Sequence, residues 1–211
     1  CKSCIFVIQL GLSRTLYSVL QEYGIDNVQA VMVRRSGDPK DSNRGPINSI
    51  EPVLGVPSHH GPDVQTVISN LNIQTMAVKV PTTIMHVHCI IAELEKEPNV
   101  EKIIQLWEET PRVDLIEGYL KNDDSKVSNL PGTAEIMELA RDSLYTRGDL
   151  NQIAVWRDGV HAFGNKLYYY QAIHQESDVV PENIDAIRAM CGLEEDNMKS
   201  IVKTNASLGI N

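Results

Sequence analysis

Four of the six histidines in this 211-residue chain lie in two short segments. His59 and His60 stand in residues 56–64 (VPSHHGPDV), and His86 and His88 close residues 81–88 (PTTIMHVH). Histidine changes its charge near neutral pH and is a common proton shuttle and metal ligand. Both segments flank runs of strand-like sequence, so we expect the four imidazoles to converge on one site.

The two histidine pairs differ in how strongly they indicate chemistry. His86 and His88 are two residues apart and therefore share one face of a predicted strand. Such a pair is typical of one buried, hydrogen-bonded ring and one ring at the rim, and we assign His88 only this structural role. Adjacent histidines in a loop rich in proline and glycine have little packing purpose, so we expect His59 and His60 to bind a ligand.

Two further groups of residues are candidates for a site. Arg34 and Arg35 end a strand, and since neighbouring strand residues point to opposite faces, only one of them can serve a given pocket. Beside a histidine loop, that arginine would bind a phosphate or a carboxylate. Cys1 and Cys4 form a single C-x-x-C pair. Without a second pair this is weak evidence for zinc, and we predict no metal site.

The bulk composition excludes several classes of protein. A net charge of -9 and a pI near 5.1 argue against a nucleic-acid-binding surface. No apolar run approaches the roughly 20 residues that span a membrane. Four cysteines are too few for a disulfide scaffold, so we expect a cytoplasmic protein. The chain begins at Cys1 rather than at methionine, and we expect it to be a piece of a longer protein.

The periodicity of apolar residues predicts an α+β domain, with a mixed or antiparallel sheet and helices packed on one face. We expect helices at residues 11–23, 62–69, 99–110, 133–142, 181–191 and 194–207, and strands at 28–35, 72–80, 84–94, 112–117, 152–157, 160–163 and 166–173. Asp158-Gly159 and Gly164-Asn165 are β-hairpin signals. Residues 36–62 and 119–131 are long polar segments, and the chain lacks the glycine-rich dinucleotide fingerprint.

Several long motifs resemble archaeal-type (class II) phosphorylating glyceraldehyde-3-phosphate dehydrogenase. They are residues 31–35 (VMVRR), 44–49 (RGPINS), 56–60 (VPSHH), 81–88 (PTTIMHVH), 172–183 (AIHQESDVVPEN) and 203–210 (KTNASLGI). The similarity runs from Gly11 to the end of the chain. It implies a catalytic domain at residues 11–180. Residues 181–211 would be a helical segment that returns to a Rossmann domain outside this sequence.

The resemblance also implies a reaction and roles for residues. Members oxidise glyceraldehyde 3-phosphate with NAD or NADP and inorganic phosphate, through a cysteine thioester, as cytoplasmic homotetramers. His86 matches the catalytic base, whereas His59, His60 and Gly61 match the loop that binds the substrate phosphate, which Arg34 would assist. Arg35 and Gln175 match positions that approach the cofactor.

The match fails where the nucleophile belongs. The family has Ser-Cys-Asn-Thr-Thr directly before the first helix, and here Val7-Ile8-Gln9-Leu10 stands in place of Cys-Asn-Thr-Thr. Val7 therefore occupies the position of the cysteine. Cys4 lies three residues earlier, about 10 Å along an extended chain, and is a poor substitute. Codons for residues 6–10, read one base earlier, can spell Cys-Asn-Thr-Thr, so our hypothesis is that residues 1–10 are a frameshifted translation.

We therefore predict a fragment of a glyceraldehyde-3-phosphate dehydrogenase that is inactive as written. Two alternatives stay open. A related semialdehyde dehydrogenase would share the thioester chemistry, although the histidine loop and Arg34 favour a phosphorylated substrate. In the second alternative, the chain is a non-catalytic remnant that binds a ligand or forms oligomers.

Overall fold

The computed structural model describes residues 7–35, 49–82, 85–116, 151–174 and 177–210, and of residues 7–10 it gives the backbone alone. Within these ranges, no helix combines the length and the apolar character needed to cross a membrane. Some of the predicted features fall outside them: Cys1, Cys4, Gln175, the polar segment at 119–131 and the helix at 133–142.

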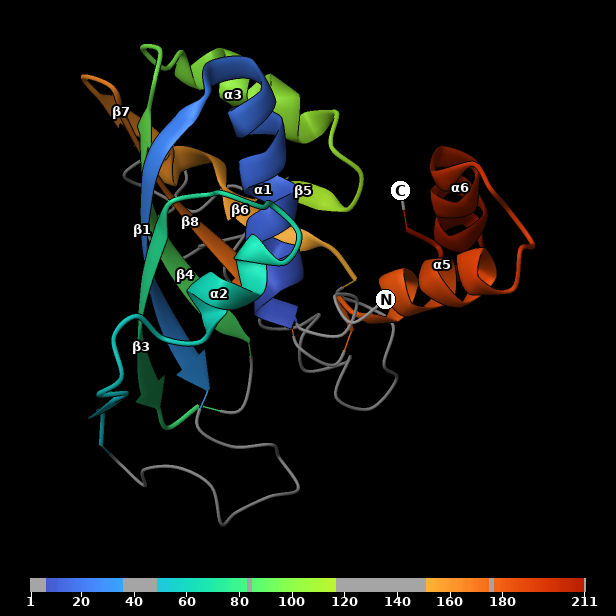
Figure 1. Ribbon diagram of the computed structural model, residues 1–211, viewed down its shortest axis with the longest axis horizontal. Coiled ribbons are helices and arrows are strands. Elements are labelled where there is room, and N and C mark those ends of the chain that lie inside the picture. Colours follow the sequence, from blue (N-terminus) through green and yellow to red (C-terminus); the bar gives the residue numbers. More distant parts are fainter. Residues whose placement is uncertain (1–6, 36–48, 83–84, 117–150, 175–176, 211) are drawn as a thin grey trace, which may run out of the picture.

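A mixed sheet forms the centre of the fold (Figure 1). Its strands are β1 (Ile25–Arg35), β2 (Glu51–Pro52), β3 (Ile73–Val80), β4 (His86–Leu94), β5 (Val113–Ile116), β6 (Ile153–Trp156), β7 (His161–Phe163) and β8 (Lys166–Ile173). The order is β2-β3-β1-β4-β8-β6-β5, and β7 pairs with β8. β1 is parallel to β3 and β5 is parallel to β6, while the other pairs are antiparallel. The predicted α+β class is confirmed.

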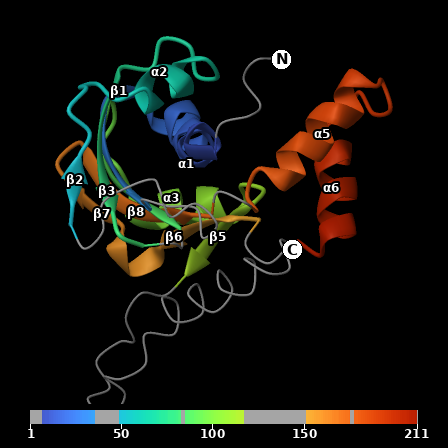
Figure 2. The same cartoon turned by 90° about the horizontal axis from the view of Figure 1, so that it is seen from below.

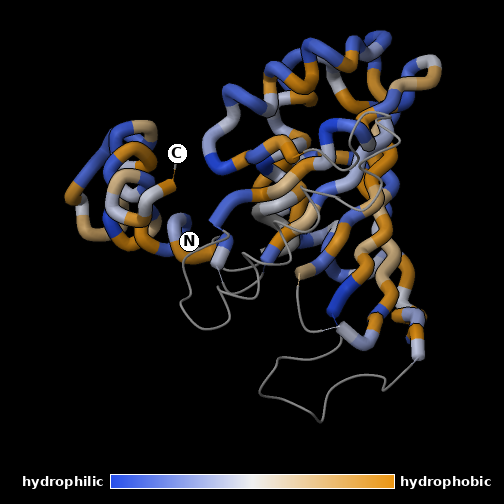
Figure 3. Tube along the Cα trace, turned by 180° about the vertical axis from the view of Figure 1, so that it is seen from behind, coloured by the Kyte–Doolittle hydropathy of each residue, from blue (hydrophilic) through white to orange (hydrophobic). Residues whose placement is uncertain are grey.

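Three helices cover one face of this sheet: α1 (Val7–Tyr23), α2 (His60–Gln65) and α3 (Val100–Glu108) (Figure 2). Hydrophobic and hydrophilic residues alternate along the strands (Figure 3), because successive strand side chains point to opposite faces. The inward positions of β4 are all buried, from His86 to Leu94. Trp107 of α3 is fully buried beneath α1, and its Nε1–H donates to the carbonyl of Thr15 at 2.9 Å.

Capping residues explain several helix ends, while other ends differ from the sequence prediction. α2 covers His60–Gln65 rather than residues 62–69, and α6 covers Asn197–Leu208 rather than residues 194–207. As predicted, α1 ends before Gly24, which has φ +70° and donates its N–H to the carbonyl of Leu20. The side chain of Asn99 caps α3 by accepting from the N–H of Lys102. However, α1 begins at Val7 rather than at Gly11. Residues 7–10 contain neither proline nor glycine, so nothing local stops the helix from extending through them.

Of the two predicted hairpins, only one forms. Gly164 has φ +59°, and the turn at Gly164-Asn165 joins the antiparallel strands β7 and β8. At Asp158-Gly159 the prediction was wrong, because the chain makes a short 3₁₀ helix, η1 (Arg157–Gly159), and β6 and β7 both pair with β8. Gly159 is not among the glycines with positive φ that a tight hairpin turn requires. Its lack of a side chain instead leaves room for the ring of Tyr170, which a Cβ atom would approach to 3.1 Å.

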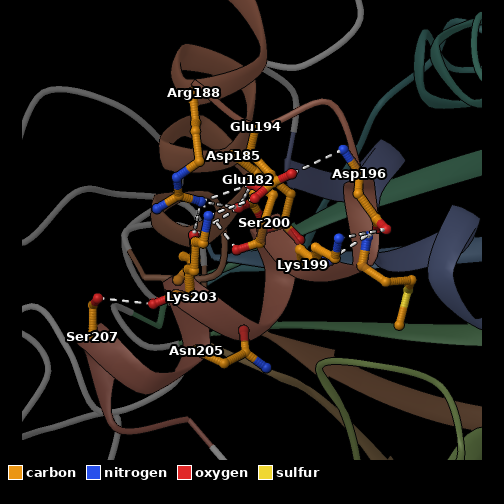
Figure 4. Close-up of polar contacts among 12 residues, drawn as sticks. Glu182, Asp185, Arg188, Glu194, Asp196, Lys199, Ser200, Lys203, Asn205 and Ser207 are labelled. Carbon is orange, nitrogen blue, oxygen red and sulfur yellow. Dashed lines mark hydrogen bonds and ion pairs between the residues drawn. The ribbon is translucent and has the colours of Figure 1, made fainter. Parts of the chain in front are cut away.

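A helical hairpin of α5 (Val180–Met190) and α6 (Asn197–Leu208) lies to one side of the sheet (Figure 1). Asp185, Arg188 and Ser200 point toward one another between the two helices (Figure 4), and Ser200 Oγ donates to Asp185 at 2.7 Å. Arg112, just before β5, connects the hairpin to the domain. Its buried guanidinium contacts Glu182 at 2.8 Å and Asp185 at 2.7 Å.

Two surfaces of the described residues expose apolar side chains. One is the outer side of the hairpin, which carries Ile187, Met190, Leu193, Met198 and Val202, each more than half exposed. The other is the sheet face opposite α1, α2 and α3, which we call the open face. It carries Val31, Met76, Cys89, Phe163 and Tyr170, all of them exposed or half-buried.

Candidate active site

The carboxyl end of β1 and the amino end of β4 meet at one end of the sheet. The two strands are antiparallel, with Met32 opposite His88. His86 and His88 are buried on the face that the helices cover. Arg34 lies two residues beyond the fully buried Met32 and so shares that face, whereas Arg35 belongs to the opposite face. The structure thus distinguishes the two arginines: Arg34 shares the histidine side of the sheet.

His59 and His60 reach the same region because α2 is tied to β3. Thr75, fully buried on β3, donates through its hydroxyl to the carbonyl of Ser58 at 3.0 Å, and the hydroxyls of the two residues lie 2.8 Å apart. The N–H of Gly61 donates to Thr75 Oγ1 at 3.0 Å, so this N–H is already occupied. A Cβ atom on Gly61 would lie 3.3 Å from the carbonyl oxygen of Ile73. Glycine is therefore needed for the close approach of the loop to the strand.

The charges of these residues act on one another. Burial lowers the pKa of His60 to about 3, with further lowering by His59, Arg34 and His86. The pKa of His88 falls well below its ordinary value for the same reason, burial first and then the charges of His86, His60 and Arg34. We refer to Arg34, His59, His60, His86 and His88 as the histidine–arginine cluster.

The cluster contains buried polar groups without a hydrogen-bond partner among the described residues. Burial lowers the pKa of Arg34, as expected when a cation loses water without gaining a partner. Arg34 Nε, His60 Nε2 and His88 Nε2 are buried and have no hydrogen-bond partner among the described residues. Buried polar groups in native proteins nearly always have one. Asp63 is the carboxylate nearest to the two adjacent histidines in the described part of the chain.

The tautomer of His86 is set by its neighbour. Nδ1 of His86 accepts a hydrogen bond from the backbone N–H of Arg35 at 3.1 Å. A neutral ring with this acceptor must carry its proton on Nε2. In the arrangement shown, Nε2 of His86 is therefore a donor. This N–H can donate a hydrogen bond to an oxyanion or to a thiolate.

The start of α1 lies beside this cluster. A Cβ atom on Gly11 would lie 2.9 Å from Cγ2 of Ile173 and 3.2 Å from the amide nitrogen of Gln171. Ile173 stands opposite His86 in the sheet, and the amide nitrogen of Gln171 lies 3.1 Å from Nδ1 of His88. Val7, the first residue of α1, precedes Gly11 by four residues, or about one helical turn.

The structure thus brings together most of the predicted site residues, and it adds Thr75, Ser58 and Gln171. Sequence reasoning missed these three. A signal was present for two of them, because Thr75 and Gln171 are polar residues at inward positions of otherwise apolar strands. Cys4 and Gln175 lie outside the described residues.

The chain is thus an α+β domain with a cluster of histidines and one arginine at one end of a mixed sheet. The family model described as "Glyceraldehyde 3-phosphate dehydrogenase, C-terminal domain" matches residues 10–159. The glyceraldehyde-3-phosphate dehydrogenases of Thermococcus kodakarensis and Pyrococcus abyssi are each 54% identical to this chain over 200 residues. These residues cover 95% of this chain and 56% of each relative. That of Methanothermus fervidus is 50% identical over 201 residues, 95% of this chain and 57% of its own.

The chain belongs to the glyceraldehyde 3-phosphate dehydrogenase family and corresponds to its C-terminal domain. It spans about half the length of the curated relatives that it matches. The resemblance inferred from the sequence motifs is confirmed.

Proposed function

We propose that this chain is the catalytic part of an enzyme that oxidises glyceraldehyde 3-phosphate to 1,3-bisphosphoglycerate, using NAD or NADP and inorganic phosphate. The observation that supports this most is Arg34, a half-buried cation without a partner among the described residues, on the same side of the sheet as His60 and His86. A phosphate group would satisfy these donors together. A semialdehyde substrate would leave them unsatisfied.

In this proposal the residues of the cluster have different roles. Arg34, His59 and His60 bind the substrate phosphate, and Gly61 keeps their loop against β3 by its close approach to Ile73. Arg34 acts as a permanent cation, whereas His60 is neutral near pH 7 and binds through its ring N–H. The phosphate thereby fixes the position of the aldehyde relative to His86.

His86 is the proposed proton-transfer group. With Nδ1 held by the N–H of Arg35, its Nε2–H stabilises a thiolate, or the oxygen that becomes negative when a thiolate attacks the aldehyde. To accept a proton at Nε2, the neutral ring must change tautomer and give up this hydrogen bond. We propose that His86 does so when it acts as the base.

The nicotinamide cofactor, when bound, accepts the hydride that leaves the substrate carbon. Arg35 is the described residue that we propose at its edge. The side chain of Arg35 belongs to the face opposite Arg34 and therefore lies outside the cluster. Gln175, the other proposed contact, lies outside the described residues.

The nucleophile is the part that the chain does not supply as written. Because Val7 stands where the family has its cysteine, we propose that this polypeptide binds phosphate but does not turn over substrate. Purified chain with glyceraldehyde 3-phosphate, NADP and phosphate should show no thioester-dependent reduction of NADP. Turnover comparable to that of a complete enzyme would refute this. The coding DNA for residues 6–10 tests the frameshift hypothesis independently.

Titration with inorganic phosphate tests the anion site directly. Arg34→Met should weaken phosphate binding about tenfold or more, since a charge-assisted hydrogen bond contributes about 1.5–3 kcal/mol. Arg157→Met, which removes an arginine from η1, is the matched control and should leave the affinity unchanged. Equal affinities of the Arg34→Met variant and the parent would rule out this site.

The open face favours a second function, self-association, which does not require activity. Val31 and Met76 are neighbours across β1 and β3, and both are exposed. We propose that a second copy of the chain covers this face in a homo-oligomer, a tetramer in the intact enzyme. Met76→Lys should then shift sedimentation toward the monomer, while Leu54→Lys, in an exposed loop, should not. A cytoplasmic location stays a prediction from the sparse cysteines.

A further inference from the structure

Three side chains with metal-binding groups meet at the start of α2. One ring nitrogen of His59, one of His60 and one carboxylate oxygen of Asp63 all lie within 4.8 Å of one another. The two rings are adjacent, with centroids 3.8 Å apart. Outside this group, the described residues contain no other set of three or more such side chains close enough to hold an ion.

Helical geometry explains why these residues converge. His59 has the backbone angles of a helix, and the N–H of Asp63 donates to its carbonyl at 3.1 Å. Asp63 therefore follows His59 by four positions and His60 by three, the two spacings that place helical side chains on one face. The bonds that tie Ser58 and Gly61 to Thr75 hold this turn in place.

A structural role accounts for only part of the arrangement. Asp63 in the first turn of α2 has a favourable interaction with the helix dipole. This does not explain His60, which is only 2% exposed and whose Nε2 has no hydrogen-bond partner among the described residues. The phosphate proposed above would take the single N–H of this neutral ring, which leaves the lone pair of the other ring nitrogen for a cation. A buried imidazole beside a second imidazole and a carboxylate is a set of side chains that binds metal ions in proteins.

We propose that His59, His60 and Asp63 bind a divalent transition-metal ion such as Zn²⁺. Two imidazoles and one carboxylate are a common zinc ligand set, which leaves a fourth position open for water or an anion. In a tetrahedral site with bonds of about 2.0–2.1 Å, neighbouring ligand atoms lie about 3.4 Å apart. The exposed His59 and the half-buried Asp63 can close this difference by side-chain rotation while His60 stays fixed.

Zinc titration calorimetry in a buffer without phosphate tests this site. Thiols also bind zinc, so every titration uses a chain with Cys1→Ser and Cys4→Ser, the C-x-x-C pair outside the described residues. We expect one ion per chain. Asp63→Asn and His59→Asn should each weaken binding by about tenfold or more, since even the outer partners of metal ligands contribute 10–100-fold. Asp26→Asn, which removes an exposed carboxylate of β1, is the control and should bind like the parent.

The inference goes beyond the phosphate site, and paired variants separate the two. Asp63→Asn should lose zinc and keep phosphate, whereas Arg34→Met should lose phosphate and keep zinc. Zinc should also raise the unfolding temperature of the parent and not that of Asp63→Asn. The metal proposal is overturned if the parent binds no zinc, or if Asp63→Asn binds it as tightly as the parent does. If the parent chain does not bind phosphate, only the proposed function is overturned.

Discussion

Replacement of His60 by asparagine should make the stability of this chain less sensitive to pH between 7 and 5. Burial lowers the pKa of His60, the first residue of α2, from 6.5 to about 3. Between these two values the unfolded chain binds a proton that the folded chain does not. Stability is therefore complete above about pH 6.5 and falls as the pH decreases toward 3.

The size of the effect follows from the shift. One pKa unit corresponds to about 1.36 kcal/mol, so with values of 6.5 and about 3, His60 alone removes about 2 kcal/mol of stability between pH 7 and pH 5. His88 acts in the same direction, because its pKa is also lowered by burial. Carboxylates titrate mostly below this window, which isolates the histidines.

Urea unfolding at several pH values measures this dependence. His60→Asn should lose about 2 kcal/mol less than the parent between pH 7 and pH 5, whatever its stability at pH 7. His161→Asn is the matched control, since His161 is exposed on β7, and it should follow the parent. Parallel curves for His60→Asn and the parent would show that His60 takes up its proton in the folded state, and would refute the argument.

Three further predictions concern the core, the hairpin and the open face. Arg112→Met should destabilise the chain by about 1.5–3 kcal/mol and speed hydrogen exchange in α5 and α6, because Glu182 and Asp185 lose their buried cation and keep only Arg14 and Arg188. Arg157→Met breaks only a surface pair and should cost about 1 kcal/mol or less; equal losses would contradict this. Trp107→Phe should cost about 2 kcal/mol in urea unfolding, since it removes the donor to the Thr15 carbonyl and leaves a cavity; no loss would exclude that bond's role. Maleimide should label Cys191 before Cys89, because burial raises the pKa of the Cys89 thiol. Higher protein concentration should slow the labelling of Cys89 and not that of Cys191. An unchanged labelling rate of Cys89 would exclude self-association through the open face.

Local periodicity was sufficient to predict most strands of the sheet, including β1 and β4, which carry Arg34 and His86. β8 was predicted with its exact bounds, and β3 differs by one residue, because alternating apolar residues identify a half-buried strand directly. The convergence of Arg34, His60 and His86 could be expected from the motifs. Which of the two arginines joins the histidines could not, because this depends on the register between β1 and β4.

The failures arise where tertiary contacts override a local signal. Asp158-Gly159 has the composition of a tight turn, but β6 and β7 both find their partner in β8, and Gly159 is used for close packing against Tyr170 instead. Thr75 was read only as part of a strand. Its hydroxyl holds the Ser58–Gly61 turn, a contact between segments 14 to 17 residues apart that no local pattern encodes.

The hairpin of α5 and α6 shows how polar contacts can hold an element whose apolar side is exposed. Isolated helices of 11 and 12 residues are marginal in water, and Ile187 and Met190 contribute little burial to α5. Burial raises the pKa of Asp185, but hydrogen bonds from Thr204, Ser200 and Arg112 outweigh it, so this pKa lies below its ordinary value. Its charged form is therefore favoured by folding. The hairpin is attached to the sheet through charge, and its apolar side stays free to meet another surface.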